Sequence, residues 1–384
     1  MDSFVLEYRD YFQTRIRQYE ASHPSHTLDL PTGTPDTTVC ARIRPLTAQK
    51  LADKNQKSSF NLDEVYGPET STKGIYDSPG GVSELADYAL AGKTGMLLAY
   101  GQTGSGKTFT VVGLEELLVE KLMSAKDREV HVCIFEVAGK NLYDLLNNRN
   151  PITTMEDLFG TVQLIGVHEK NPKTATEFLG FIEEAKSHRS TASTSKNDTS
   201  SRSHSICRIR ILNPASPTAT EGSLLLVDLA GSEASSDTTH HTKERMLETV
   251  EINKSLSVLK ECITKRAAFT IARSEGAQKH VHIPFRSSKL TQVLKSAFDV
   301  QSSQSSKTII IACIAPSILD VAHSKNTFRY AETLRIPVPK AKPLPFDERI
   351  PTTWSNADVH AWIRKYASPS PSFCFFGKAM LTHE

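Results

Sequence analysis

The sequence has 384 residues, of which 39% are hydrophobic and 23% are charged, and its formal net charge at pH 7 is +2. This composition is that of an ordinary soluble protein with one large domain or two. The longest apolar run, at 309–316, is far too short to span a bilayer, and the acidic start "MDSF" does not have the pattern of a signal peptide. With so small a net charge, an acidic partner has to be met by a local basic face.

The cysteines are scattered along the chain and form no C-x-x-C pair. Most of them lie in apolar stretches, which is typical of reduced core cysteines in a cytosolic protein. They are Cys40, Cys133, Cys207, Cys262, Cys313 and Cys374. We therefore expect no disulfide and no metal site built on cysteine.

Apolar runs that alternate with helical patterns predict an α/β fold. The expected strands are 37–43, 94–100, 129–137, 204–212, 223–228 and 307–315. In "CRIRIL", Cys207, Ile209 and Ile211 share one face and two arginines share the other, which is typical of a half-exposed strand. Helical spacing is present at Ile252, Leu256, Leu259 and Ile263, and again at Leu290, Val293, Leu294 and Ala297. Helices between mostly buried strands indicate a central, mostly parallel or mixed sheet with helices on both faces.

The segment "GQTGSGKT" at 101–108 fits the phosphate-loop pattern G-x-x-x-x-G-K-[ST] and follows the strand expected at 94–100. Its glycines let the backbone bend tightly, so that backbone N–H groups can approach phosphate oxygens. Lys107 can reach the β- and γ-phosphates, and the Thr108 hydroxyl can ligate Mg²⁺. The full motif after a strand predicts that the chain binds a nucleoside triphosphate.

Two later segments carry groups that suit the same site. "NDTSSRSHS" at 197–205 gathers hydroxyls, an amide and an arginine, which a γ-phosphate and its Mg²⁺ need from a switch loop, although such clusters also mark ordinary loops. In "LLLVDLAGSE" at 224–233, Asp228 ends an apolar strand and suits a carboxylate that holds Mg²⁺ through water. Gly231 can offer its N–H to the γ-phosphate, but Asp-x-x-Gly after a strand is also a common turn.

In this order, the phosphate loop, "SSRSH" and "DLAGSE" resemble the kinesin motor domain. The resemblance continues through "ARIRPL" (41–46), "EINKSLSVLKECI" (251–263), "HIPFRSSKLTQVLKSAF" (282–298) and "FRYAETLR" (328–335), and it covers residues 37–336. The sequences of 251–263 and 282–298 are most similar to the internal-motor, microtubule-depolymerising branch. That branch projects a long hairpin tipped by Lys-Val-Asp after the first strand, whereas only the short "TAQKLADKNQKSS" separates Leu46 from Phe60 here.

The resemblance implies a role for each matching residue. The residues that would border the adenine are Arg42, Arg44 and Pro45. Those that would hold the phosphates of ATP or ADP are Gln102, Thr103, Gly104, Ser105, Gly106, Lys107 and Thr108. The first switch would contain Asn197, Ser200 and Ser201, and the second Asp228, Gly231 and Glu233. The implied metal ligands are Thr108, Ser201 and, through water, Asp228.

The resemblance also implies how the site closes. Arg202 and Glu233 would pair across the two switches when ATP is bound, because this charge-assisted pair forms only when both loops are drawn in. Positioned water and charge stabilisation would carry most of phosphoryl transfer, with Glu233 relaying through water. The residues expected to take part in catalysis are Lys107, Ser201, Arg202, Asp228, Gly231 and Glu233.

One residue departs from the family pattern beside the base. Kinesins often carry His directly after the Lys-Thr of the loop, and this chain has Phe109. The Phe109 ring either stacks on adenine without a polar handle or packs into the core. Guanine is not favoured, because the sequence has no Asn-Lys-x-Asp element.

The helix expected to begin near Glu251 would, by the resemblance, sense the γ-phosphate and lie on the microtubule, with Asn253 coupling filament contact to nucleotide release. Because the filament surface is acidic, we expect basic residues on one side of this helix and of the next element. The candidates are Lys254, Lys260, Arg286, Lys289 and Lys295. Each alone is typical of a solvated charge, but their clustering favours a basic face. No basic stripe with interleaved aromatics points to nucleic acid.

The flanks carry weaker signals. Residues 3–19 place apolar side chains on one helical face, so 1–36 contain either a neck helix or a helix that docks on the motor itself, followed by a linker. The proline-rich 337–350 predicts an extended linker. Residues 351–384 resemble the opening of a sterile-alpha-motif domain but are too few to complete one, so we expect a short helical tail. Self-association through these flanks stays open.

The sequence therefore predicts a kinesin-like motor in the cytoplasm, associated with the microtubule or spindle cytoskeleton, that couples ATP hydrolysis to microtubule binding, movement or end-remodelling. Two alternatives remain. One is a microtubule-binding scaffold with weak or lapsed ATPase, which the intact Lys107, Arg202 and Glu233 disfavour. The other is a P-loop switch unrelated to filaments. We expect no membrane and no nucleic-acid partner.

Overall fold

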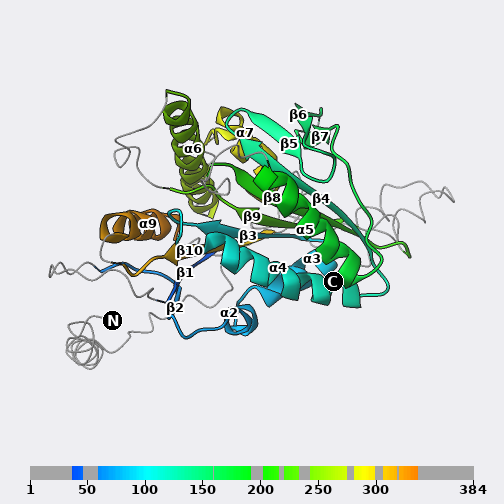
Figure 1. The fold of residues 1–384 in the computed structure, drawn as a ribbon, viewed down its shortest axis with the longest axis horizontal. Helices are drawn as coiled ribbons and strands as arrows, with labels where there is room; N and C mark the ends of the chain where they lie inside the picture. The colour runs from blue at the N-terminus through cyan, green and yellow to red at the C-terminus, as the bar shows by residue number, and fades with distance from the viewer. Residues whose placement is uncertain are drawn as a thin grey trace, which may run out of the picture.

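The computed structural model describes residues 37–45, 59–158, 160–191, 202–215, 220–232, 243–274, 281–298, 306–317 and 320–335. In these ranges a 10-stranded sheet is covered by helices on both faces (Figure 1). The strand order across the sheet is β2-β1-β10-β3-β9-β8-β4-β5-β6-β7. The expected neck at 1–36, linker at 337–350 and tail at 351–384 lie outside the described residues.

One half of the sheet is parallel. Its strands are β2 (Glu64–Tyr66), β1 (Thr37–Ile43), β10 (Ser306–Ile314), β3 (Thr94–Tyr100) and β9 (Gly222–Asp228). Every residue of β3 is buried, because Leu97 packs into the core on one face and Leu98 into the core on the other. Ala99 and Asp228 are paired in register, so the loops that follow β3 and β9 meet at one edge of the sheet.

The other half is antiparallel and makes the sheet mixed, as predicted. Its strands are β8 (His204–Leu212), β4 (Glu129–Ala138), β5 (Asn141–Asp144), β6 (Asn150–Glu156) and β7 (Val162–Ile165). The half-exposed strand predicted from "CRIRIL" is confirmed: Cys207, Ile209 and Ile211 are buried, while Arg208 and Arg210 bind Glu169 at 2.9 and 2.7 Å. The strands β2, β5, β6 and β7 were not predicted from the sequence.

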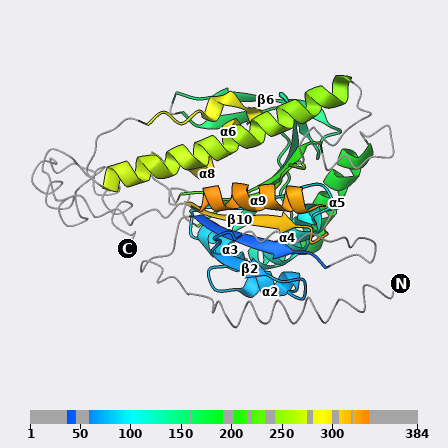
Figure 2. The same ribbon diagram turned by 90° about the vertical axis from the view of Figure 1, so that its left-hand side faces the viewer.

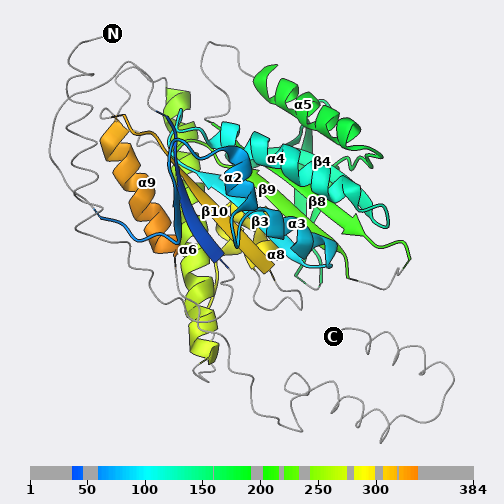
Figure 3. The same ribbon diagram turned by 90° about the horizontal axis from the view of Figure 1, so that it is seen from below.

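The helices form two layers (Figures 2 and 3). One layer contains α2 (Thr72–Asp77), α3 (Ser83–Leu90), α4 (Lys107–Ser124) and α5 (Ala175–Thr191). The other contains α6 (Lys243–Ser274), η3 (Phe285–Ser287), α7 (Lys289–Val293), α8 (Lys295–Phe298) and α9 (Val321–Leu334). The helix predicted around Ile252–Ile263 is confirmed within α6, but it begins at Lys243, eight residues before the expected start near Glu251. The spacing at 290–297 falls on two short helices instead of one, and Leu290, Leu294 and Ala297 are all buried.

The cysteines of the described ranges are free and buried. Cys40, Cys133, Cys207, Cys262 and Cys313 are buried free thiols, as predicted, and Cys374 lies outside the described residues. Among the helices that the structure describes, none has both the length and the apolar character that crossing a membrane requires.

Candidate functional site

The predicted phosphate loop joins the end of β3 to the first turn of α4. At Gly101 the backbone has φ 151°, and a Cβ there would lie 2.4 Å from the carbonyl oxygen of Cys313. Gly106 precedes α4 with φ 95°, which is also a conformation that side chains disfavour. The loop can therefore lie close to the end of β10 while the N-terminus of α4, which favours anions, stays accessible at its mouth.

Three side chains of this loop are buried. Lys107 is 6% exposed, and its Nζ donates a hydrogen bond to the carbonyl oxygen of Gln102 at 2.8 Å. Among the described residues, Gln102 Oε1 and Ser105 Oγ have no hydrogen-bond partner. Buried polar groups are normally paired, so these atoms fit a loop that receives a polar ligand such as a phosphate chain.

The predicted metal ligands Thr108 and Asp228 are in contact. Thr108 Oγ1 donates to Asp228 Oδ2 at 2.9 Å, which joins the first turn of α4 to the end of β9. The second carboxylate oxygen, Asp228 Oδ1, is buried and has no hydrogen-bond partner in the part of the chain that is described. Mg²⁺ prefers such hydroxyl and carboxylate oxygens, so the two residues fit this ion. The third predicted ligand, Ser201, lies outside the described residues.

Asp228 also has a partner that the sequence did not reveal. Arg189, in the last turn of α5, donates from Nη1 to Asp228 Oδ2 at 3.1 Å and from Nη2 to the carbonyl oxygen of Ser203 at 2.5 Å. Ser203 Oγ donates to Glu136 Oε2 at 3.0 Å, and Arg149 pairs with the other oxygen of Glu136. A buried polar network of Arg189, Ser203 and Glu136 thus holds the Asp228 carboxylate in place.

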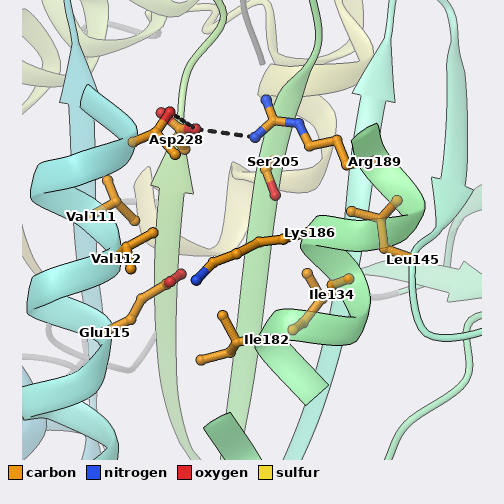
Figure 4. Close-up of a pocket in the computed structure, with 12 residues that line it drawn as sticks. Val111, Val112, Glu115, Ile134, Leu145, Ile182, Lys186, Arg189, Ser205 and Asp228 are labelled. Atoms are coloured by element: carbon orange, nitrogen blue, oxygen red, sulfur yellow. Dashed lines mark hydrogen bonds and ion pairs between the residues drawn. The ribbon is translucent and has the colours of Figure 1, made fainter. Parts of the chain in front are cut away.

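A cavity of about 40 Å³ lies beside this network, between α4 and α5 (Figure 4). Glu115 of α4 points into it toward Lys186 of α5, and Asp228 and Arg189 lie at its upper end. Glu115 is only 7% exposed, and this burial raises the pKa of its carboxyl to about 8 against the partly opposing field of Lys186. We infer that Glu115 holds a proton at neutral pH.

Glu115→Gln should therefore change how stability depends on pH. From about pH 4.5 to 8 the unfolded chain ionises Glu115 while the folded chain keeps the proton, so the wild-type free energy of unfolding should fall as pH rises through this window. The glutamine variant lacks this term, and its melting temperature relative to wild type should rise between pH 5 and pH 8.5, at roughly 2–4 °C for each kcal/mol. Thermal unfolding across this series measures it.

The exposed Glu120 of the same helix supplies the matched control. Glu120→Gln should leave the pH dependence of melting as it is in wild type. A constant difference between Glu115→Gln and wild type at every pH would mean that Glu115 is ionised in the folded protein.

The expected adenine site is bordered by an exposed aromatic ring. Phe109 is 70% exposed, so of the two alternatives for this residue, packing into the core is wrong. The guanidinium of Arg42 lies 5.3 Å from the centre of the Phe109 ring and donates to Thr110 Oγ1 at 3.0 Å. Phe109 also lines an open hollow of about 500 Å³ between α2 and α4. Arg44 and Pro45 lie directly after β1, beyond Arg42.

The switch residues are only partly described. Asn197, Ser200, Ser201 and Glu233 lie outside the described residues, so the structure does not test the Arg202–Glu233 pair. Arg202 lies 3.7 Å from Glu248 on α6, in a pair that is partly exposed on both sides. Gly231 lies directly before Ser232, whose N–H donates to the carbonyl oxygen of Gly101 at 3.2 Å. The loop after Asp228 is thus attached to the phosphate loop.

Basic residues gather in a groove beside α6. A groove of about 390 Å³ between α6, α7 and the β4–β5 turn is lined by Lys140, Lys254, Arg286 and Lys289, with Glu251 as its acidic residue. Lys140 was not among the predicted basic residues. The other two predicted cations lie outside this lining: Lys295 binds Glu156 at 2.7 Å, and Lys260 lies over the ring of Tyr330. Glu156 also binds Arg286, at 2.6 Å.

Comparison with known proteins identifies a matching family. The sequence model of the family described as the kinesin motor domain matches residues 32–336 of this chain. "Diatom spindle kinesin-1" of Cylindrotheca fusiformis is 38% identical over 72% of this chain and 43% of its own length, and "Kinesin-like protein KIN-13B" of Arabidopsis thaliana is 36% identical over 73% of this chain and 40% of its own. The chain thus spans less than half the length of these relatives.

A solved structure is similar over the same region. KIF14, described as a dimer in a two-heads-bound state with AMP-PNP in complex with a microtubule, has a TM-score of 0.64 and 27% identity. The similarity covers 78% of this chain and 93% of that one. The fold described above is therefore shared with this solved structure.

Proposed function

Since this chain belongs to the kinesin family, we propose that it binds and hydrolyses ATP and couples that reaction to microtubule binding, movement or end-remodelling. The observation that carries the proposal is the contact of Thr108 with Asp228 at 2.9 Å beside the buried Lys107. This places a hydroxyl, a carboxylate and an ammonium at the N-terminus of one helix, which is the set that a Mg²⁺-bound triphosphate needs.

Each residue has a distinct part in this proposal. Lys107 neutralises charge on the β- and γ-phosphates, and Gly106 opens α4 so that its N-terminus meets them. Thr108, Ser201 and, through water, Asp228 would hold Mg²⁺, and the bound ion would supply positive charge for the transfer. The exposed Phe109 ring offers a flat, apolar face to adenine, and the Arg42 guanidinium lies beside that ring. Arg202 exchanges its weak contact with Glu248 for Glu233 when the site closes.

The groove beside α6 is the proposed contact with the filament. Its Lys140, Lys254, Arg286 and Lys289 give it a positive character that only Glu251 opposes within the lining, and an acidic filament surface complements it. Lys260 and Lys295 flank it. KIF14, whose solved structure contains a microtubule, shares the fold over most of this chain, which supports the choice of partner.

Steady-state ATP hydrolysis with and without microtubules tests the function. We expect slow basal turnover that requires Mg²⁺ and rises steeply with microtubule concentration, and co-sedimentation that depends on the nucleotide. Turnover that filaments leave unchanged, with binding retained, would favour the scaffold with a lapsed ATPase. Hydrolysis without any co-sedimentation would favour a P-loop switch unrelated to filaments.

Neutralising Arg286 and Lys289 together should weaken microtubule binding. Each exposed ionic contact contributes up to about 1 kcal/mol, so we expect roughly a three- to thirtyfold loss of affinity and a shallower dependence on salt. Co-sedimentation across a salt series measures both. Lys126 and Arg128, in the turn between α4 and β4, form a matched control pair, and their neutralisation should leave binding unchanged. Equal losses in both double variants would exclude this face.

The finer assignment concerns end-remodelling. The sequence of 251–263, within α6, is similar to the depolymerising branch, and KIN-13B is among the relatives, but only thirteen residues separate Leu46 from Phe60. A ligand shifts an equilibrium only by its differential affinity, and a short loop gives little extra contact with a curved filament end. We expect microtubule-stimulated ATPase with weak or no depolymerisation. Incubating stabilised microtubules with ATP and excess protein, then sedimenting them, tests it: rapid release of tubulin would contradict this expectation.

A further inference from the structure

A chain of three hydrogen bonds joins the loop after Asp228 to α6. The backbone N–H of Ala230 donates to Nδ1 of His204 at 3.0 Å. Nε2 of His204 lies 2.8 Å from Ser255 Oγ on α6, and Ser255 Oγ lies 2.7 Å from the carbonyl oxygen of Ile252. His204 is 2% exposed and Ser255 is 7% exposed, so water does not compete for these bonds.

The direction of every bond in this chain is fixed. A backbone N–H can only donate, so Nδ1 of His204 is the acceptor and the ring proton of the neutral imidazole is on Nε2. That proton is donated to Ser255 Oγ, whose own proton is donated to Ile252 O. Burial lowers the pKa of His204 to about 3, helped by the positive charges of Arg189 and Lys107, so the ring stays neutral and keeps this tautomer at working pH.

The two ends of this series of hydrogen bonds lie at two different proposed sites. Ala230 directly precedes Gly231, the residue proposed to meet the γ-phosphate, and follows the strand that ends in Asp228. Ser255 lines the groove beside α6 together with Lys254 and Lys289. The side chain of His204, the first residue of β8, lies between them. Because a hydrogen bond weakens steeply once its length passes about 3.5 Å, a shift of α6 by about 1 Å is enough to alter the hold on Ala230.

We infer that His204 and Ser255 are positioning residues that transmit filament contact at the groove to the Ala230–Gly231 backbone. This inference rests on the proposed function and deepens it: α6 sets the position of the loop through one imidazole. When Ser255 moves with α6, His204 turns or loses its acceptor, and the Ala230 N–H moves with it. The link couples the two sites because both bias the same hydrogen-bonded element.

Ser255→Ala tests the α6 end of the link. It removes the acceptor of His204 Nε2 while leaving the groove cations in place. We expect the ratio of microtubule-stimulated to basal turnover to fall at least about fivefold, which is the lower range of coupling between sites. The microtubule concentration for half-maximal stimulation should change less than about twofold. Ser257→Ala, at an exposed position of the same helix, should keep the wild-type ratio, and Ser255→Thr should restore it because the hydroxyl is retained.

His204→Asn tests the other end. The asparagine side chain can still accept from Ala230 N–H but is too short to reach Ser255, so this variant should lose the same ratio as Ser255→Ala. The double variant His204→Asn, Ser255→Ala should lose no more than either single one, because both break one link. Thermal unfolding of each variant shows that the fold is retained.

Nitrogen-15 spectra of the histidine rings give a readout independent of turnover. Wild type and Ser257→Ala should show the Nε2–H tautomer for the signal that His204→Asn removes, and Ser255→Ala should shift that signal. An Nδ1–H tautomer in wild type, wild-type ratios in both single variants, or additive losses in the double variant would overturn the link alone. Wild-type turnover that microtubules do not stimulate would overturn the proposed function as well.

Discussion

Lys107→Ala should nearly abolish ATP turnover. Lys107 is buried in the phosphate loop at the first residue of α4, and it is the cation proposed to face the β- and γ-phosphates. Removing a preorganised charge of this kind costs about two to three orders of magnitude in rate. Steady-state hydrolysis at saturating microtubules measures the loss, and titration with a fluorescent nucleotide shows whether binding falls with it.

The fold should survive this change. The carbonyl oxygen of Gln102 that accepts from Lys107 also accepts from the N–H of Ser105 at 3.2 Å, so it keeps a partner in the variant. A melting temperature near that of wild type would separate a catalytic loss from unfolding. Lys126→Ala, just beyond α4, is the control for a lost surface lysine. Normal hydrolysis by Lys107→Ala would overturn the assignment of the phosphate loop.

The sequence predicted the parallel half of the sheet well and the antiparallel edge poorly. Strands such as β3 and β10 are continuous apolar runs because both of their faces are covered by helices, and such runs are visible without any alignment. The strands β5 to β7 lie at one edge of the sheet, and β5 and β7 have four residues each. Their residues "NPITTME" and "VQLI" are half exposed, so they carry too little apolar pattern to predict.

The site divides in the same way. Lys107, Thr108 and Asp228 were found because each belongs to a local motif, and the contact between Thr108 and Asp228 follows from the adjacent ends of β3 and β9. Arg189 of α5 binds the Asp228 carboxylate directly, and Glu136 of β4 is joined to it through Ser203 and Arg189. They have no local signature, since what makes them functional is burial among partners that are distant in the chain.

Arg189 and Asp228 offer the second test with a large expected effect. Arg189→Met removes the guanidinium and leaves the Asp228 carboxylate buried with only the Thr108 hydroxyl as a described partner. Breaking a buried ion pair from one side costs about 3–5 kcal/mol, because the remaining charge is uncompensated. Urea unfolding without nucleotide or Mg²⁺ should show this loss, and turnover should fall with it because the Asp228 oxygens are no longer held toward Thr108.

The double variant Arg189→Met, Asp228→Asn separates stability from catalysis. With both charges removed, no uncompensated charge is buried, and we expect at least half of the lost stability to return. Turnover should not return, because an amide is a poor replacement for the carboxylate proposed to hold Mg²⁺. If the double variant recovers turnover together with stability, Asp228 acts only through folding. If Arg189→Met is as stable as wild type, the buried ion pair between Arg189 and Asp228 does not stabilise the fold.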